Sequence, residues 1–329
     1  MKILYAIQGT GNGHLARAED VVPALQQYGD VHLFVSGSQA DIALPFPVKY
    51  RSAGLSFYFG KNGGIDIVKT FLKNSSKRIW QEIKSFPAER YDVVINDFEP
   101  ISAWAARNKH VPCVALSHQC ALLSKNVPRP QHFDPVGEWL LHHYAPAMKH
   151  VGFHFASFDR NIFTPVIRAS IRQAEPKAAG HYTVYLPAYD DRKLVVLLSK
   201  IPLVKWHVFS KHTRKPYHLG RVSVYPVNNQ EFVASMVSAS GVLCGAGFET
   251  PAEALYLGKK LLVVPMKAQY EQHYNAAALQ VLGISVLKNL KKKQLPVIQQ
   301  WIESGTTKRF EFSRITHEAV NMAMNIAFL

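Results

Sequence analysis

A glycine-rich segment near the start of the chain, residues 8–14, combines an adaptable backbone with a titratable side chain. Its alternating glycines, among them Gly11 and Gly13, let a ligand approach the backbone closely. His14 would lie in the first turn of the following helix, where the helix dipole disfavours the protonated imidazole. The ring would then be neutral near pH 7 and able to accept a proton. The alternative is a tight turn with Asn12 as helix N-cap, in which His14 has no chemical role.

This glycine pattern does not fit a dinucleotide-binding loop. The fingerprint of such loops needs a glycine where His14 stands and an acidic residue at the end of the second strand. The second apolar run ends in Val35-Ser36-Gly37, which contains no acidic residue. Binding of NAD is therefore not expected.

Two carboxylates and a second histidine follow later apolar runs. Asp97 and Glu99 come after the run that ends at Asn96, and His118 follows the run that ends at Ser117. Either carboxylate could orient a base or act as one, and His118 could line a substrate cleft. The structural alternatives are a helix N-cap for the carboxylates and an internally hydrogen-bonded histidine.

The segment from residue 244 to residue 255 is the most informative. Glycine-rich backbone, including Gly247, precedes Thr250, the predicted N-cap of a helix. Pro251 at the first helical position and Glu253 three residues after the cap complete a capping box. The free amides of such a helix start suit a phosphate. Glu253 is open to two interpretations, as the capping partner of Thr250 or as a carboxylate that holds a ribose diol.

A polar pair lies beyond the next apolar run, Leu261–Val264. Glu271 and Gln272 offer acceptors and donors suited to sugar hydroxyls. The alternative is the start of a solvent-exposed helix.

The sequence shows neither a metal motif nor a disulfide framework. The three cysteines, Cys113, Cys120 and Cys244, are too few and too irregularly spaced for either a zinc cluster or a set of disulfides. This use of cysteine predicts a reducing compartment, the cytoplasm. The apolar run Ile3–Ile7 is too short for a signal peptide, and no apolar run approaches the roughly 20 residues that span a bilayer.

Helices and strands must hold these residues in place, and the pattern of apolar residues along the chain predicts an α/β fold. Strand-like runs alternate with helix-period segments, which predicts parallel sheets covered by helices. Ligands bind at the carboxyl ends of strands in such sheets, which is where the residues above lie. The predicted strands form two series of five: Ile3–Ile7, Val31–Ser36, Val93–Asn96, Val111–Ser117 and Val151–Ala156, then Thr183–Leu186, Lys205–Ser210, Val222–Tyr225, Gly241–Cys244 and Leu261–Val264.

Two series of strands predict two similar domains. We expect an N-terminal domain over residues 1–165 and a C-terminal domain over residues 166–312. Residues 313–329 have a helical period and would pack back on the first domain.

The charge is strongly basic and unevenly distributed. The formal net charge is +15, and residues 166–329 carry 21 basic and 10 acidic side chains, against 17 and 13 in residues 1–165. This balance admits nucleic acid, anionic lipid or phosphorylated metabolites as partners. Nucleic acid is not expected, because the sequence has no finger, no RNP-type aromatic motif and no dense Lys/Arg tract.

One segment is a candidate surface for anionic lipid. At helical spacing, Lys69, Lys73, Lys77 and Lys84 fall in one stripe together with Trp80. The alternative is a core-facing helix with a solvated lysine flank. The lipid interpretation would place the protein at the inner face of the membrane as a peripheral protein.

The motifs together resemble the nucleotide-sugar-dependent glycosyltransferases of the glycosyltransferase-B fold. These include the peptidoglycan-precursor N-acetylglucosaminyltransferase and the plant-type glucosyltransferases. The resemblance covers nearly the whole chain. It rests on the loop from Gly9 to His14, on Asp97, on residues 247–255, and on Glu271-Gln272 with Asn275-Ala276. It implies two Rossmann-like domains that face a central cleft.

The resemblance also implies roles for individual residues. His14 would be the base and Asp97 would orient it, and we expect the opposite effects of Asp97 and the helix dipole on the pKa of His14 to offset each other. Glu99 and His118 would lie on the acceptor side. The implied donor-binding residues are Gly11, Gly13, Val227, Gly247, Phe248, Thr250, Glu253, Glu271 and Gln272.

The function implied is transfer of a sugar from a nucleoside-diphosphate sugar, here a UDP-sugar, to an acceptor hydroxyl. The transfer would invert the anomeric carbon and use no metal and no cofactor. The alternatives are a nucleotide-sugar epimerase of the same fold and a non-catalytic sugar-nucleotide or lipid-binding protein. Two residues depart from the plant pattern, Gly245 in place of a histidine and Glu249 in place of an asparagine.

Overall fold

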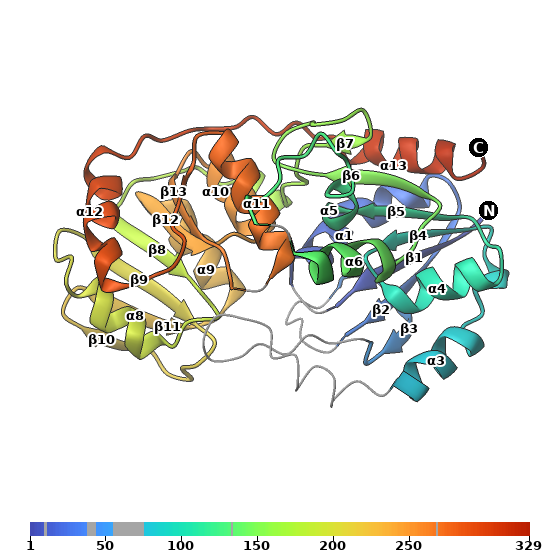
Figure 1. Ribbon diagram of the computed structural model, residues 1–329, viewed down its shortest axis with the longest axis horizontal. Helices are drawn as coiled ribbons and strands as arrows, with labels where there is room; N and C mark the ends of the chain where they lie inside the picture. The colour runs from blue at the N-terminus through green and yellow to red at the C-terminus, as the bar shows by residue number, and fades with distance from the viewer. Residues whose placement is uncertain (10–11, 38–43, 55–75, 133, 268) are drawn as a thin grey trace.

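Two sheets, each covered by helices, lie side by side along the long axis of the molecule (Figure 1). The computed structural model describes residues 1–9, 12–37, 44–54, 76–132, 134–267 and 269–329. Both chain termini lie beside the first sheet, at the same end of the molecule (Figure 1). The chain therefore begins and ends in the same half.

The first sheet contains seven parallel strands in the order β3-β2-β1-β4-β5-β6-β7. They are β1 Lys2–Gln8, β2 Asp30–Ser36, β3 Val48–Ser52, β4 Val93–Asp97, β5 Cys113–Ser117, β6 Lys149–Phe153 and β7 Ile162–Phe163. All five predicted strands of this half are present. The two edge strands, β3 and β7, were not predicted.

The second sheet also contains seven strands, in the order β10-β11-β9-β8-β12-β13-β14, and only β10 is antiparallel. They are β8 His181–Tyr185, β9 Lys205–Ser210, β10 Tyr217–Leu219, β11 Val222–Pro226, β12 Gly241–Gly245, β13 Lys260–Val264 and β14 Ser285–Val286. The expected count of five strands per sheet is therefore wrong in both halves. The edge strands β10 and β14 are too short to show an apolar period.

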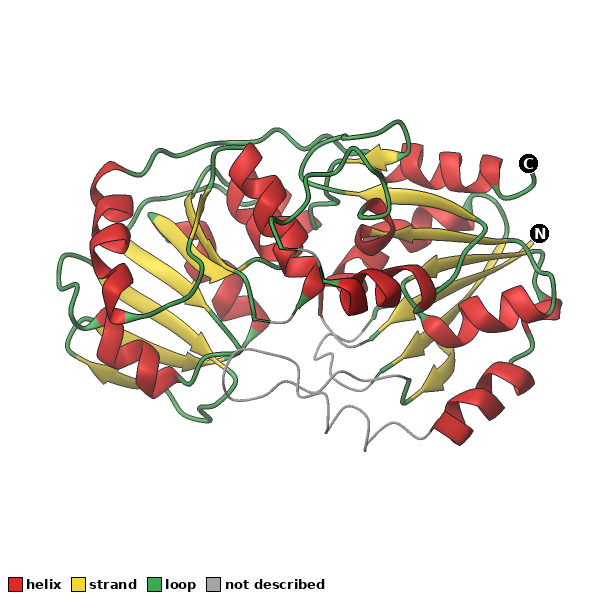
Figure 2. Cartoon of the chain, viewed as in Figure 1, coloured by secondary structure: helices red, strands yellow, loops and turns green. Residues whose placement is uncertain are grey.

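Helices cover both faces of each sheet (Figure 2). The helices of the first half are α1 Asn12–Gln26, α3 Ser76–Ser85, α4 Pro100–Asn108, α5 His118–Ala121 and α6 Pro135–His143, with the 3-10 turn η1 Ala88–Arg90. The rest are α7 Ala169–Arg172, α8 Asp191–Leu198, α9 Asn229–Ser238, α10 Glu249–Tyr256, α11 Tyr270–Val281, α12 Leu295–Ser304 and α13 Thr316–Ile326, with the 3-10 turn η2 Lys292–Gln294.

Strand β1 shows how the sheets are buried on both faces. Ile3 and Tyr5 belong to one apolar cluster, while Leu4 and Ala6 point to another on the opposite face. All four side chains are fully buried. A continuous apolar run is what a parallel strand covered on both sides requires.

The last helix, α13, packs on the first half of the molecule. It contacts α1, β5 and β6, and Tyr28 Oη donates to Asn321 Oδ1 at 3.1 Å.

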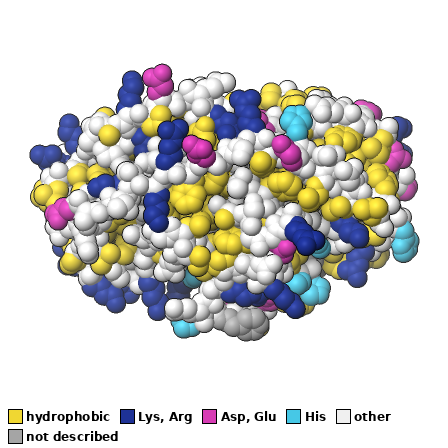
Figure 3. All heavy atoms as spheres, turned by 90° about the horizontal axis from the view of Figure 1, so that it is seen from above, with side chains coloured by type: hydrophobic (Ala, Val, Ile, Leu, Met, Phe, Trp, Pro, Cys, Tyr) yellow, Lys and Arg dark blue, Asp and Glu magenta, His cyan; other side chains and the backbone are white. Residues whose placement is uncertain are grey.

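On the face seen from above, Lys and Arg side chains are spread among apolar and acidic ones (Figure 3).

Candidate active site

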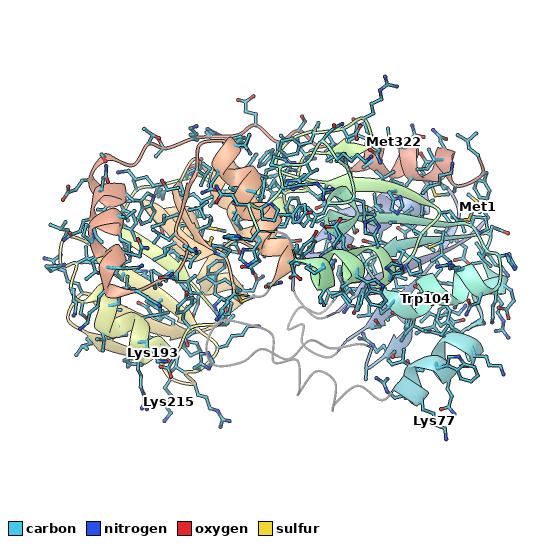
Figure 4. The ribbon with its side chains drawn as sticks, viewed as in Figure 1. Met1, Lys77, Trp104, Lys193, Lys215 and Met322 are labelled. Carbon is cyan, nitrogen blue, oxygen red and sulfur yellow. The ribbon has the colours of Figure 1, made fainter. Side chains whose placement is uncertain are left out.

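Polar side chains from the ends of both sheets meet between the two halves. Strands β1, β4 and β5 end beside this site in the first sheet, and β12 and β13 end beside it in the second. His118 Nε2 lies 2.7 Å from Asn275 Oδ1, and Gln119 Nε2 donates to Glu271 Oε2 at 3.0 Å. Figure 4 shows the side chains of both halves meeting in the middle of the molecule. The two halves therefore build one site.

His14 and Asp97 are in direct contact at the centre of the site. His14 Nδ1 lies 2.8 Å from Asp97 Oδ1. Arg17, one turn further along α1, donates from Nε and Nη2 to the Asp97 carboxylate at 3.0–3.1 Å. Asp97 is 0% exposed and Arg17 3%, whereas His14 is 13% exposed. With Nδ1 turned to Asp97, Nε2 of His14 is the nitrogen left to accept a proton.

The electrostatics of this cluster are dominated by the ion pair. Burial lowers the pKa of His14, but the charge of Asp97 and the hydrogen bond to it outweigh burial, so the pKa is raised above 6.5. Burial raises the pKa of Asp97, but Arg17 and His14 together lower it below its ordinary value. The net direction for His14 is therefore upward. The expected offset between the helix dipole and Asp97 stays a prediction.

A tight turn after β4 holds Asp97 in place. Phe98 adopts a φ of 58°, a left-handed conformation that is rare outside glycine and concentrates at functional sites. Its ring packs on Tyr144 at a centroid distance of 4.8 Å. Asn96 Nδ2 donates to the Glu99 carbonyl at 2.7 Å, and the Glu99 amide donates to Asn96 Oδ1 at 3.0 Å. These contacts fix the turn, and Asp97 with it.

Glu99 is the N-cap of α4. Its carboxylate accepts from the amides of Ile101 and Ser102 at 2.9 and 2.6 Å, and from the Ser36 hydroxyl at 2.7 Å. The side chain is fully buried. The geometry therefore favours the capping alternative for Glu99 over a place on the acceptor side.

His118 is also held internally. Nδ1 lies 2.8 Å from the Phe153 carbonyl, and the ring stacks on Phe248 at a centroid distance of 3.9 Å. Burial lowers the pKa of His118 to about 4, so the ring is neutral at physiological pH. The geometry favours the alternative of a hydrogen-bonded histidine that packs the two halves together.

Helix α10 starts earlier than the sequence predicted. It begins at Glu249, and Phe248 is an N-cap without a side-chain hydrogen bond. The predicted N-cap Thr250, and its capping box with Glu253, are therefore wrong. The first amides of a helix have no partner inside it, so Pro251 fits any early position and did not fix the start. A Cβ on Gly247 would meet nothing within 4 Å, so this backbone borders open space.

Glu253 is bound by an arginine from the segment between the sheets. Arg168 donates from Nε and Nη2 to the two carboxylate oxygens at 2.5 and 2.8 Å, and from Nη1 to Asn229 Oδ1 at 2.8 Å. The side chains of Arg168 and Glu253 are only 15% and 6% exposed. A ribose diol can bind Glu253 only by sharing or displacing Arg168.

Glu249 makes a second contact of α10 with an arginine. Its Oε1 lies 3.6 Å from Arg17 Nη1, across the boundary between the halves. The carboxylate also rests against Gly13 and leaves no room there for a Cβ. Gly13 is thus required for close approach of the halves, which explains one glycine of the N-terminal loop.

Two adjoining cavities open at the carboxyl ends of the second sheet and share a wall of Pro187, Ala188 and Met266. The smaller, of about 80 Å³, is lined in part by Gly245, Gly247, Thr250 and Gln272. The larger, of about 810 Å³, is lined in part by Val227, Lys211, His212 and Arg214. Several predicted donor-binding residues therefore line these two neighbouring cavities.

Gln119 lies between the predicted base, His14, and the predicted sugar-binding carboxylate of Glu271. Its Nε2 lies 3.0 Å from Glu271 Oε2 and 3.5 Å from His14 Nε2. Its Oε1 is buried and has no hydrogen-bond partner among the described residues. One amide nitrogen therefore reaches both the predicted base and the predicted sugar-binding carboxylate. Burial raises the pKa of Glu271.

Sequence reasoning missed three residues of this site: Arg17, Gln119 and Arg168. Arg17 lies one helical turn after His14, and this spacing could have identified it as a neighbour. The partners of Arg168 and Gln119 lie far along the chain, and no local pattern pairs them.

Some predicted residues fall outside the described ranges. Gly11 does, and so do Lys69 and Lys73 of the lysine stripe.

In the described part of the lysine stripe, Trp80 is 61% exposed, and Lys84 Nζ lies 5.2 Å from the centre of the Trp80 ring. Ile79, one residue away, is buried against the first half.

Metal sites and membrane spans were sought among the described residues only. Within them, no group of three or more His, Cys, Asp or Glu side chains is arranged to hold a metal ion. No described helix combines the length and the apolar character needed to cross a bilayer.

Comparisons with known proteins agree with this architecture. The sequence matches glycosyl transferase family 1 over residues 1–304. None of the curated proteins matches it. Similar solved structures include the glycotransferase of kitacinnamycin, with a TM-score of 0.59, 15% identity and coverage of 99% of this chain and 97% of that one.

Two plant enzymes are similar in the same way. UGT2 of Phytolacca americana, solved with UDP-2fluoro-glucose and pterostilbene, has a TM-score of 0.57 and 14% identity, with 99% of this chain and 94% of that one covered. UGT89C1 of Arabidopsis thaliana, solved with UDP-L-rhamnose, has a TM-score of 0.60 and 13% identity, with 98% and 94% covered.

These structural likenesses establish the fold, two Rossmann-like domains in the glycosyltransferase-B arrangement. The sequence match spans all but the last 25 residues, and the matched range contains the whole site described above. The chain is therefore a glycosyltransferase that belongs to glycosyl transferase family 1.

Proposed function

We propose that this glycosyltransferase moves a sugar from a UDP-sugar to an acceptor hydroxyl, with inversion at the anomeric carbon and without a metal ion. The observation that carries the proposal is the meeting of the His14–Asp97 pair with Glu271 across Gln119. A proton acceptor and a sugar-binding carboxylate within reach of one amide group define where the acceptor hydroxyl and the donor sugar would meet.

His14 is the general base in this proposal. Its Nε2 removes the proton of the acceptor hydroxyl while the oxygen attacks the anomeric carbon and the bond to the diphosphate breaks. Asp97 is a positioning residue that holds Nδ1 and stabilises the imidazolium that forms. A single displacement from the face opposite the leaving group inverts the anomeric carbon. Asp97 is fully buried, which argues against Asp97 as the nucleophile of a double displacement.

The departing diphosphate would be stabilised by the start of α10. The backbone at Gly247 borders open space, and the amides of the first helical turn, which have no partner within the helix, belong to the positive end of a helix dipole. Arg17 lies beside this helix start, but the carboxylates of Asp97 and Glu249 share its positive charge. In place of a metal ion, the helix amides are therefore the main stabilisers of the leaving group in this proposal.

The remaining donor contacts follow the surrounding residues. The nucleoside base would lie in the larger cavity, against the backbone at Val227, and the ribose would bind Glu253. Glu271 and Gln272 would hold the sugar hydroxyls. UDP is proposed as the nucleotide because UDP-sugars occupy the plant enzymes of the same fold.

The test is hydrolysis of the donor, since water can replace an unknown acceptor. We expect slow hydrolysis of an α-linked UDP-sugar to release the β-anomer first, as followed by proton NMR, with an unchanged rate after treatment with EDTA. Release of the α-anomer first would overturn inversion, and loss of the rate with EDTA would overturn metal independence. His14→Ala is the control for an uncatalysed background.

The same experiment separates the proposal from an epimerase. An epimerase would convert the donor sugar with no acceptor present and would leave an isomerised sugar in the NMR spectrum. Binding of UDP with no turnover of any sugar or acceptor would instead indicate a non-catalytic binding protein.

A further inference from the structure

A third cavity, which adjoins the smaller donor-side cavity at Tyr189, has a composition that points to a ligand. It has a volume of about 550 Å³ and lies between α8 and the segment that leads into η2. Its apolar lining comes from Leu194, Val196, Leu197 and Leu290. Val196 is 60% exposed, so its side chain is accessible to a ligand. We call this cavity the α8 pocket.

Cationic side chains surround the apolar part of the α8 pocket. Five of them line it: Arg192, Lys193, Lys200, Lys291 and Lys292. Asp190 is the one acidic residue among the described residues of the lining, and its Oδ1 accepts from the Arg192 amide at 2.9 Å as the N-cap of α8. A helix cap is already committed to backbone, so the lining carries a large excess of positive charge.

Two of these lysines lie close enough to oppose each other's charge. The positive charge of Lys292 lowers the pKa of Lys200, although both side chains are open to solvent. Like charges held at the mouth of one cavity repel, and an anion bound between them removes the repulsion. In Figure 4, Lys193 points away from the protein at the same edge, so a ligand can reach this region from solvent.

The α8 pocket is separated from the donor side by a fixed wall. Tyr189 lines both the α8 pocket and the smaller donor-side cavity. Its hydroxyl accepts from the Leu290 amide at 3.3 Å, which ties the wall to the segment before η2. A ligand in the α8 pocket would therefore occupy a place of its own, behind the donor site.

We propose that the α8 pocket binds a phosphate group carried on an apolar moiety. Several ammonium groups around one opening match the multiple negative charge and many acceptors of a phosphate ester. The leucines and the exposed valine would cover the adjoining apolar part. The chemistry recognised is the same whether the phosphate belongs to the headgroup of an anionic lipid in a bilayer or to a free amphiphile.

The test uses dihexanoylphosphatidic acid below its critical micelle concentration, with inorganic phosphate and vesicles of phosphatidic acid in phosphatidylcholine as parallel arms. Binding is measured by calorimetry for the soluble probes and by sedimentation for the vesicles. The variant is Lys200→Gln with Lys292→Gln, which removes two charges from exposed side chains. The matched control is Lys125→Gln with Lys149→Gln, which removes the same charge from exposed sites elsewhere.

We expect the short-chain lipid to bind more tightly than inorganic phosphate, because only the lipid covers the apolar lining. Each lysine near an anionic lipid contributes about a factor of five, so the pocket variant should bind roughly 25-fold more weakly and the control unchanged. Binding of the vesicles but not of the soluble lipid would identify a bilayer as the source. Equal losses in the two variants, or no binding in any arm, would overturn the proposal.

Discussion

The pair formed by Arg168 and Glu253 allows a test with two variants, Glu253→Gln and Arg168→Gln. Both should destabilise the fold by a similar amount, but they should change nucleotide binding in opposite directions. Two charged hydrogen bonds of 2.5 and 2.8 Å join these nearly buried side chains. Breaking a buried ion pair costs about 3–5 kcal/mol because it strands the other charge. Glutamine keeps one acceptor, and Asn229 keeps its contact with Arg168. We therefore expect Glu253→Gln to lower the free energy of unfolding by about 3 kcal/mol, the lower end of this range. Arg168→Gln leaves Glu253 as the unpaired buried charge instead, and it should lower the free energy of unfolding by about the same amount.

Nucleotide binding separates the two variants. If Glu253 holds the ribose, Glu253→Gln loses a charged hydrogen bond of about 1.5–3 kcal/mol and should weaken UDP binding by at least about tenfold. Arg168→Gln frees both carboxylate oxygens, so UDP should bind more tightly than in the wild type.

Calorimetry with UDP and 2′-deoxy-UDP provides the readout, and thermal unfolding provides the control for the fold. Preference for UDP over its deoxy analogue should persist in Arg168→Gln and vanish in Glu253→Gln. Equal changes in UDP affinity for both variants, with the preference intact, would refute the ribose role and leave Glu253 as the structural partner of Arg168.

Other consequences concern the base, the cleft and the lipid surface. His14→Ala should lower turnover by about 10²–10⁴-fold with donor affinity nearly intact, and Asp97→Asn should cause a smaller loss; near-normal turnover of His14→Ala with unchanged melting would place the base elsewhere. Since Asp97 raises the pKa of His14 and the free base is the active form, kcat/KM should fall on acidification at a higher pH than for an ordinary histidine, and Asp97→Asn should move this limb to lower pH. An unmoved limb would exclude His14 as the titrating group. Gly13→Ala would clash with Glu249 and should lower activity, while a second change, Glu249→Ala, should restore it; failure of the rescue would mean that the clash is not the cause. Lys77→Gln with Lys84→Gln should reduce sedimentation with anionic vesicles at low salt, and no change would leave α3 as an ordinary surface helix.

The central strands and their order along the chain were predictable because each is buried on both faces and therefore reads as an apolar run. Edge strands such as β7 and β10 were not, since two or three residues carry no period. The apolar runs placed His14 and Asp97 at the carboxyl ends of strands. Their pairing was implied by the family resemblance alone.

The start of α10 and the contacts of its glutamates lay beyond the sequence. Proline and threonine are permitted at several positions of a first helical turn, so the pattern around Thr250 fitted more than one start. Arg168 and Glu253 lie 85 residues apart along the chain and meet only in the folded protein. The sequence left Glu99 open between a helix N-cap and an acceptor-side residue, and the structure makes it the N-cap of α4.

The return of α13 to the first half affects how this enzyme can be recombined with its relatives. The helix contacts α1, β5 and β6, so the chain crosses between the halves twice, before β8 and again before α13. A chimaera that exchanges the first half at a single junction would pair α13 of one parent with α1 of another and lose the contact of Tyr28 with Asn321. Exchange of the first half therefore needs two junctions, with the last helix taken from the same parent as the first.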